Sequence, residues 1–136
     1  MKRAVLWDSS AILALLDASD ADHDRAVRAA QRMALERRPC FVTNYIEAEA
    51  HALLLRKLGR ALALEWLLKG GLPVIRVLPS EEDRAKEILS GHADKDWSLS
   101  DATSFALLDS RGVWAALSFD RHFRQYGKIE VLGPRS

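Results

Sequence analysis

The chain has 136 residues, a length typical of one domain with its own hydrophobic core. Its net charge of +1 excludes nucleic-acid recognition by bulk charge, so any such binding needs a local basic patch. The single cysteine, Cys40, excludes an internal disulfide and a multi-cysteine zinc site. No apolar run reaches the roughly 18 residues of a membrane span, and Asp8 interrupts what could resemble a signal peptide. We therefore expect a cytoplasmic protein with a single domain over residues 1–136.

Short apolar runs alternate with stretches of helical spacing along the first half of the chain. Residues 4–7 predict a strand buried on both faces, and this strand stops at Asp8, which could simply be the N-cap of the following helix. The next predicted elements, in order, are helices over residues 11–16 and about 25–37, a strand over 40–43, and helices over about 45–57 and 60–68.

The second half of the chain continues this alternation. The predicted elements are a strand over residues 72–78, helices over about 80–90 and 101–110, a strand over 113–119, a short helix over 122–125, and an edge strand over 128–132. Strands that alternate with helices indicate βαβ units. The sequence therefore predicts an α/β fold with a mainly parallel central sheet of about four or five strands.

Carboxylates stand where the predicted strands end and where helices begin. Asp8 and Asp120 follow buried strands, Asp101 opens a helix, and Glu47 and Glu49 lie near the start of the helix after the second strand. Strand ends of a parallel sheet converge on one edge, so these acids can meet there. Crowded carboxylates repel one another unless a cation or protons compensate them, and an all-oxygen site suits Mg²⁺ or Mn²⁺ rather than zinc. Taken singly, Asp101 could only cap its helix and Asp120 could only open a turn.

Other polar side chains near these acids have two interpretations each. Asp96 could be a peripheral ligand or a solvated loop acid. Ser9 and Ser118 could bind carboxylates or phosphate, or could serve as cap and turn residues. Arg121 and Arg124 could contact the phosphate backbone of a nucleic acid or form part of a solvated face.

Histidine and tryptophan give weaker signals. His23 and His122 have no partner that the sequence identifies, so we expect ordinary surface histidines. Trp97 lies in a loop and is expected to be partly exposed. The other three tryptophans are expected in the core: Trp7, Trp66 and Trp114.

Four blocks of sequence occur in a fixed order: VLWDSSAILALLDASDADHDRA, FVTNYIEAEAHALLLRKLG, DWSLSDATSFALL and WAALSFDRHFRQYG. Together they resemble the PIN domain, and most of all its compact single-domain members, which include VapC-type toxin ribonucleases. The resemblance implies a three-layer α/β/α fold and cleavage of RNA that depends on Mg²⁺ or Mn²⁺. It also implies an acidic site made of Asp8, a glutamate after the second strand, Asp101 and Asp120.

The glutamate of this site is Glu49 or Glu47. In the family, this block reads as a hydroxyl or Asn stretch, a few apolar residues, and a Glu that opens a leucine-rich helix, which favours Glu49. Glu49 also shares a helix face with Ile46 and Leu53, so it should lie toward the buried side. Glu47 should be the more exposed of the two.

The resulting prediction is a metal-dependent endoribonuclease, the toxin of a type II toxin–antitoxin pair. The alternative is a non-catalytic PIN-type module that binds RNA or protein, but such a module gains nothing from four mutually repelling acids. A phosphatase of the haloacid-dehalogenase type needs a second acid where Ser10 stands, and a receiver domain needs an aspartate where the third strand ends at Leu78.

The resemblance further implies two protein partners. One is a cognate antitoxin whose peptide covers the acidic cleft. The other is a second copy of the chain, in a homodimer through the leucine-rich stretches 53–55 and 62–68, although core packing explains those leucines equally well.

Overall fold

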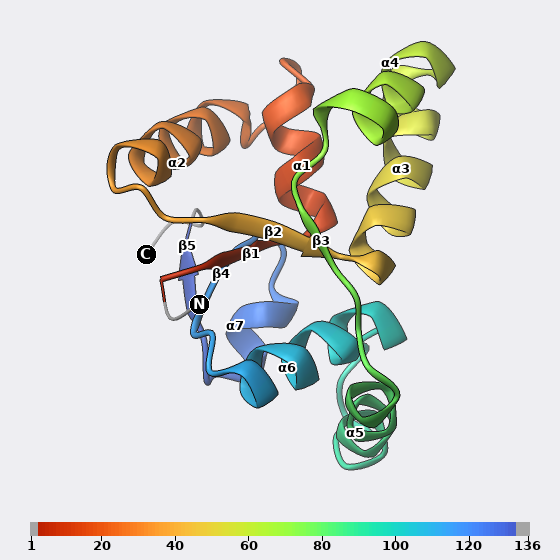
Figure 1. The fold of residues 1–136 in the computed structure, drawn as a ribbon. Coiled ribbons are helices and arrows are strands. Elements are labelled where there is room, and N and C mark those ends of the chain that lie inside the picture. The colour runs from red at the N-terminus through yellow and green to blue at the C-terminus, as the bar shows by residue number, and fades with distance from the viewer. Residues whose placement is uncertain (1–2, 133–136) are drawn as a thin grey trace.

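A sheet of five strands forms the middle layer of the protein (Figure 1). The computed structural model describes residues 3–132. The strands follow the spatial order β3-β2-β1-β4-β5, and each of the four pairings is parallel. Their bounds are β1 Val5–Trp7, β2 Cys40–Thr43, β3 Val74–Ile75, β4 Ala115–Leu117 and β5 Glu130–Leu132. The predicted α/β class and parallel sheet are confirmed, with β5 at an edge as expected.

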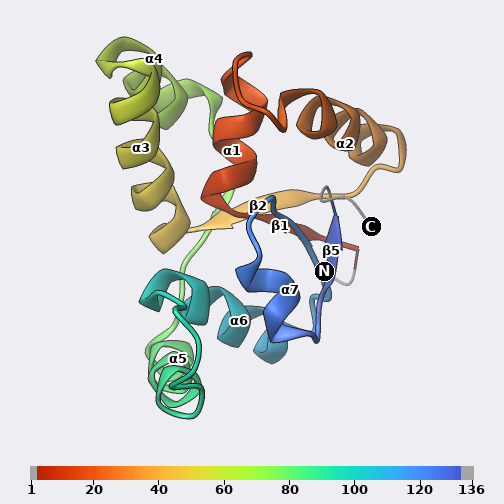
Figure 2. The same cartoon turned by 180° about the vertical axis from the view of Figure 1, so that it is seen from behind.

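Helices cover both faces of this sheet. Helices α1 to α4 lie on one face, while α6 and α7 lie on the other with α5 packed against α6 (Figures 1 and 2). Their bounds are α1 Ser9–Leu16, α2 His23–Leu35, α3 Asn44–Leu58, α4 Arg60–Glu65, α5 Pro79–Ser90, α6 Leu99–Arg111 and α7 His122–Tyr126, and α4 continues into a π-helical turn, Trp66–Gly70. The three-layer α/β/α arrangement is therefore confirmed. Within residues 3–132, no helix combines the length and the apolar character that a membrane crossing requires.

The third strand is much shorter than the sequence predicts. Residues 72–78 were expected to form it, but only Val74 and Ile75 pair with β2. Beyond them, the side-chain oxygen of Asn44 accepts the backbone N–H of Val77 at 2.8 Å, so this N–H is satisfied without a neighbouring strand. The prediction for the fourth strand, residues 113–119, was also too long, since β4 spans three residues.

The core lies between the sheet and the helices on both sides. Helix α6 is its central element, because every residue from 102 to 108 is buried. Trp97 is also buried, at 7% exposure, with its ring packed edge-on against Phe105 and Tyr126. Trp114, the residue directly before β4, is 50% exposed. The predictions for these two tryptophans were wrong, and those for Trp7 and Trp66 are confirmed.

A buried ion pair joins α5 to α6. The guanidinium of Arg111 donates two hydrogen bonds of 3.0 Å, one to each carboxylate oxygen of Glu81, and Glu81 is only 3% exposed. The carboxylate also accepts the N–H of Leu78 at 2.8 Å and the hydroxyl of Ser110. Burial alone would raise the pKa of Glu81, but these donors outweigh burial and hold the pKa below its usual value.

Replacing Arg111 with Ala should destabilise the fold by roughly 3 kcal/mol, because Glu81 would keep a buried charge without its partner. Urea unfolding of both proteins measures the difference. The matched control is Arg84→Ala, which removes an exposed arginine 3.6 Å from Glu87 and should cost no more than about 1 kcal/mol. Equal losses of unfolding free energy in the two variants would show that the buried Glu81–Arg111 pair stabilises the fold no more than an exposed pair does.

Candidate active site

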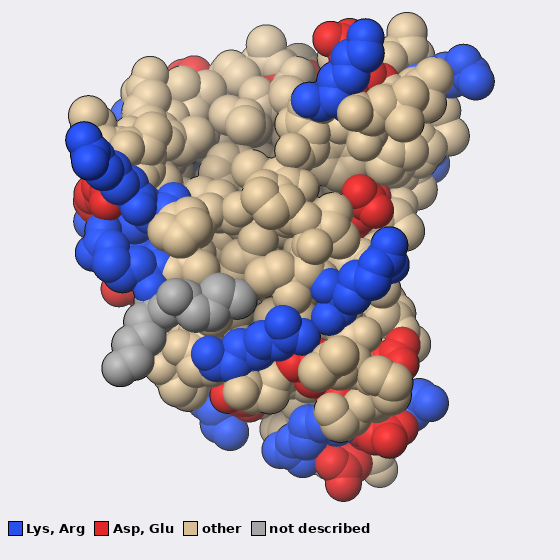
Figure 3. Space-filling view, viewed as in Figure 1, with Lys and Arg blue, Asp and Glu red and all other residues tan. Residues whose placement is uncertain are grey.

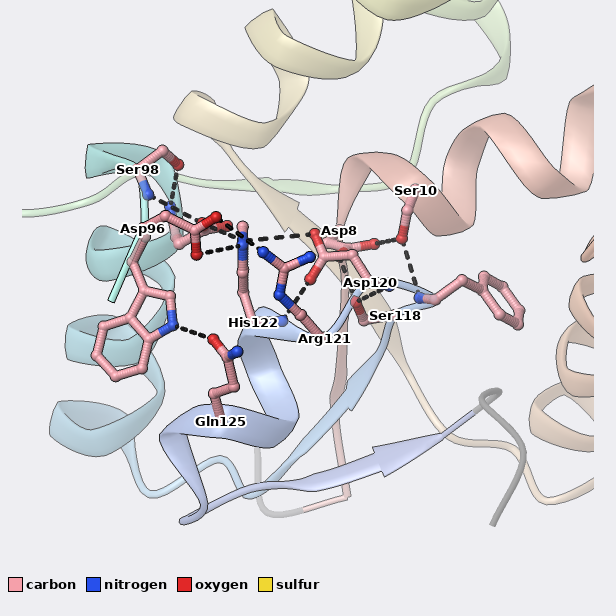
Figure 4. A network of polar contacts seen from close by, with 12 residues as sticks. Asp8, Ser10, Asp96, Ser98, Ser118, Asp120, Arg121, His122 and Gln125 are labelled. Atoms are coloured by element: carbon pink, nitrogen blue, oxygen red, sulfur yellow. Dashed lines mark hydrogen bonds and ion pairs between the residues drawn. The ribbon is translucent and has the colours of Figure 1, made fainter. Parts of the chain in front are cut away.

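Asp8 lies at the carboxyl end of β1, where it caps α1. Its Oδ1 atom accepts the N–H of Ala11 at 3.0 Å and the hydroxyl of Ser10 at 2.6 Å, and the Ser118 hydroxyl donates to Oδ2 (Figure 4). The Ser118 oxygen in turn accepts the N–H of Asp120 at 3.3 Å. The helix-cap interpretation of Asp8 is therefore confirmed, and Ser118 binds a carboxylate while connecting Asp8 to Asp120.

The carboxyl group of Asp8 is almost completely buried, at 4% exposure. Burial is the largest influence on it and raises its pKa to about 7. The hydroxyls of Ser10 and Ser118 oppose this rise, and the charge of Asp120 adds to it. The surrounding residues therefore do not supply the positive charge that would stabilise an ionised Asp8.

Asp101 and Asp120 each have a local structural role beside their place in the cluster. Asp101 forms a reciprocal cap with Ser98, in which Ser98 N–H donates to Oδ2 at 3.0 Å and Asp101 N–H donates to the hydroxyl at 3.1 Å. Asp120 opens a turn by accepting the N–H of His122 on its Oδ1 atom at 2.7 Å. Burial chiefly raises the pKa of Asp101, with the charge of Asp120 adding to it. The expected cap and turn roles are thus confirmed, and they leave oxygens of both residues facing the cluster.

His122 lies among these acids, so the prediction of an ordinary surface histidine was wrong. Its Nδ1 atom is 2.8 Å from Asp101 Oδ2 and 3.8 Å from Asp120 Oδ2, and its Nε2 atom is 3.3 Å from Asp96 Oδ1. The turn that Asp120 opens starts α7 at once and brings the ring back toward α6. The Asp-x-His spacing after the fourth strand is the sequence signal that could have identified it. His23 also has a partner, since its Nδ1 atom lies 2.8 Å from the carbonyl oxygen of Ala14.

Glu49 reaches the same cluster from α3. Partial desolvation of its carboxylate beside the cluster is the main cause of its raised pKa, which the Ser9 hydroxyl lowers and the charges of Asp101 and Asp120 raise further. The expectation about exposure was nevertheless wrong, because Glu49 is exposed and Glu47 is partly buried. Glu49 is therefore reached by solvent and also by the charges of the neighbouring acids. The charges of Asp101 and Asp120 act on the Glu49 carboxylate, so the three acids lie close enough to repel one another.

Two further candidates lie beside the cluster. Asp96 is an exposed loop acid, as one of its two interpretations predicts, and Arg121 donates a 2.9 Å hydrogen bond to its Oδ2 atom (Figure 4). Both partners are largely exposed. Arg121 is thus already paired with an acid, whereas Arg124 is an exposed residue of the last turn of α7.

The residues at this edge fit a small divalent cation. One ligand atom each from Asp101, Asp120 and His122 lies within 4.8 Å of the others. The raised pKa values of Asp8, Glu49 and Asp101 indicate carboxylates that a cation would stabilise. The carboxylate oxygens suit Mg²⁺ or Mn²⁺, and the imidazole nitrogen beside them is a donor that Mn²⁺ accepts more readily than Mg²⁺.

A parallel α/β/α fold with acids converging at the strand ends is the architecture of a known class. The PIN domain model matches residues 5–129, and the chain belongs to the PIN domain family. It is 33% identical over 131 residues to the 23S rRNA-specific endonuclease VapC20 of Mycobacterium tuberculosis, an alignment that covers 93% of this chain and 97% of that protein. The family resemblance seen in the sequence is thereby confirmed.

Solved structures agree with this assignment. The crystal structure of M. tuberculosis VapC20, described as a toxin that cleaves the sarcin–ricin loop, matches with a TM-score of 0.79 at 30% identity, over 94% of this chain and 98% of that one. The DNA-bound VapBC complex of Salmonella typhimurium has a chain that matches with a TM-score of 0.70 over 96% and 97% of the two chains. Its 15% identity shows a shared fold.

Proposed function

We propose that this protein is a divalent-metal-dependent endoribonuclease, with ribosomal RNA as its substrate class. The observation that carries the proposal is the convergence of Asp8, Glu49, Asp101 and Asp120 at the carboxyl edge of the sheet, where the pKa values of the first three are raised. The relationship to VapC20, an endonuclease specific for 23S rRNA, supports RNA as the substrate.

The four acids would hold Mg²⁺ or Mn²⁺. A cation bound there supplies activation of a water molecule and neutralisation of charge on the phosphodiester and its leaving oxygen. Ser10 and Ser118 orient the Asp8 carboxylate, and the Ser98 cap orients that of Asp101. Because these partners fix the carboxylates before RNA arrives, the acids need little rearrangement on binding.

Recognition of RNA must come from local groups of basic residues. On the face shown in Figure 3, the Lys and Arg side chains of the described residues lie in separate groups and do not form one continuous patch. This distribution agrees with the small net charge of the chain. On this face, we infer that separate basic groups and not one extended patch would contact the RNA backbone.

Incubation of the purified protein with ribosomal RNA tests the proposal. We expect discrete cleavage products with Mn²⁺ or Mg²⁺ and none with excess chelator. A non-catalytic PIN-type module would instead bind the RNA and leave it intact in every condition. Cleavage that persists in chelator would contradict metal dependence.

Glu49→Gln should lower metal-dependent cleavage by on the order of 10²-fold, because the amide cannot replace a carboxylate that neutralises a cation. Initial cleavage rates at saturating Mn²⁺ measure this effect. The control is Glu47→Gln on the same helix, which should change the rate less than about threefold. A larger loss in the Glu47 variant would reassign the glutamate.

Two partner proposals accompany the enzymatic one. A cognate antitoxin peptide would cover the acidic edge, as the resemblance to VapC-type toxins suggests, and the cytoplasm is the compartment where RNA and antitoxin meet. A homodimer is the second proposal. The leucine stretches have mixed roles, since Leu54 is fully buried whereas Leu55, Leu62 and Leu68 are 43%, 36% and 69% exposed and are available for an interface.

A further inference from the structure

His122 connects Asp96 to the acidic cluster through its two ring nitrogens (Figure 4). The Nδ1 atom is shielded from solvent, and it has no hydrogen-bond partner among the residues that the structure describes. It nevertheless lies 2.8 Å from Asp101 Oδ2 and 3.8 Å from Asp120 Oδ2. The nitrogen therefore approaches two carboxylates closely without the alignment of a hydrogen bond.

These separations suit atoms that share one cation. Ligands at about 2.1 Å from an octahedral ion and at right angles to each other lie about 3 Å apart, and opposite ligands lie about 4 Å apart. The two distances from Nδ1 to carboxylate oxygens, 2.8 and 3.8 Å, fall close to this range. A hydrogen bond between Nδ1 and Asp101 would explain the shorter distance, but its required geometry is missing.

Asp96 faces the other nitrogen of the ring. Nε2 is 3.3 Å from Asp96 Oδ1, so a carboxylate lies beside one ring nitrogen while the other ring nitrogen, Nδ1, lies beside the carboxylates of the cluster. Histidines that bind metals commonly have a carboxylate in this position, which fixes the tautomer and the ring orientation. Asp96 also accepts a 2.9 Å hydrogen bond from Arg121, and the next residue, Trp97, donates a 2.9 Å hydrogen bond to Gln125 of α7.

We propose that His122 is a nitrogen ligand, through Nδ1, of the divalent cation in the acidic site, and that Asp96 is the positioning residue that orients its ring. The inference rests on the proposed metal-dependent function, and it adds a preference between Mn²⁺ and Mg²⁺. Mg²⁺ favours all-oxygen coordination with bound waters, whereas Mn²⁺ accepts an imidazole nitrogen more readily. The site should therefore prefer Mn²⁺ to Mg²⁺, and it should lose much of this preference when the imidazole is removed.

Pulsed electron paramagnetic resonance of the Mn²⁺-loaded protein tests the coordination without any assay of activity. The unmodified protein should show coupling of Mn²⁺ to a histidine nitrogen, and the signal should change when histidine is labelled with ¹⁵N. His122→Gln should abolish this coupling and weaken Mn²⁺ binding by roughly 10- to 100-fold in titration calorimetry. His92→Gln is the matched control, because His92 contacts the Ile88 carbonyl and Trp97 and should leave both measurements unchanged.

Asp96→Asn tests the positioning role separately. It should retain the nitrogen coupling while lowering Mn²⁺ affinity by about tenfold, since the ligand remains but its orientation is less fixed. Mn²⁺ that binds to the acids without histidine coupling would overturn the inference and leave the proposed nuclease site in place. Failure of the unmodified protein to bind Mn²⁺ at all would overturn the proposed function as well.

Discussion

Asp8→Asn is expected to reduce metal-dependent RNA cleavage by on the order of 10³-fold or more. Asp8 is buried at the end of β1. The Ser118 hydroxyl donates to Asp8 and accepts the N–H of Asp120, so the Asp8 carboxylate lies within the acidic cluster. Asparagine has nearly the same shape and is an equally good helix N-cap, which preserves the bond to the Ala11 N–H. The loss should therefore appear in the cleavage rate and leave the fold intact, as circular dichroism would verify.

The control for this variant is Asp17→Asn at the other end of α1. Asp17 follows the last residue of that helix and accepts two hydrogen bonds from Ser19, away from the acidic cluster. Its substitution should leave the cleavage rate within about threefold of the parent. Full activity of Asp8→Asn would remove Asp8 from the proposed site.

The metal-free protein is expected to lose stability as the pH rises from 5 to 8. The pKa of Asp8 is about 7 in the folded state, above its ordinary value of 3.8. A raised carboxyl pKa contributes stability that is complete below the unfolded pKa and is lost as the pH rises through the folded pKa. One pKa unit corresponds to about 1.4 kcal/mol. This shift of about three units should therefore lower the free energy of unfolding by on the order of 4 kcal/mol between acidic pH and pH 8.

Other groups with altered pKa values do not reverse this trend. Glu49 and Asp101 have raised pKa values and act in the same direction. Glu81 has a lowered pKa, so its contribution is present above the unfolded pKa and is lost only as the pH falls through the folded pKa, which lies below the usual carboxyl value and therefore outside this window. The window from pH 5 to 8 therefore reports mainly on the acidic cluster.

Urea unfolding in chelator at several pH values measures this effect. The parent should be least stable at pH 8, and Asp8→Asn should be more stable than the parent there, with a much smaller dependence on pH. Saturating Mn²⁺ should restore stability to the parent at pH 8, because a cation compensates the ionised carboxylates. An unchanged pH slope in the Asp8 variant would contradict the assignment of the raised pKa.

Local patterns predicted most of the fold. Apolar runs bounded by caps and glycines identified every strand and helix, because burial on both faces of a parallel strand leaves a continuous apolar run. The length of β3 escaped prediction because Asn44, some thirty residues earlier in the chain, satisfies the Val77 N–H. The exposure of Trp114 and the burial of Trp97 likewise depend on which surfaces the assembled layers cover.

The sequence predicted those site residues whose positions follow from the order of strands and helices. Asp8 and Asp120 stand at strand ends and Asp101 at a helix start, positions that a parallel sheet brings to one edge. The relation of His122 to Asp101 and Asp96 was not predictable in this way, because it depends on the angle of a five-residue helix after a tight turn. The exposure of Glu49 similarly depends on how open that edge is.

The central claim is that these acids bind one or more divalent cations at the carboxyl edge of the sheet. Crystals soaked in Mn²⁺ and measured for anomalous scattering test it most directly. We expect a strong peak within about 2.3 Å of carboxylate oxygens from at least two of Asp8, Glu49, Asp101 and Asp120. A peak elsewhere on the molecule, or no peak at saturating Mn²⁺, would contradict it.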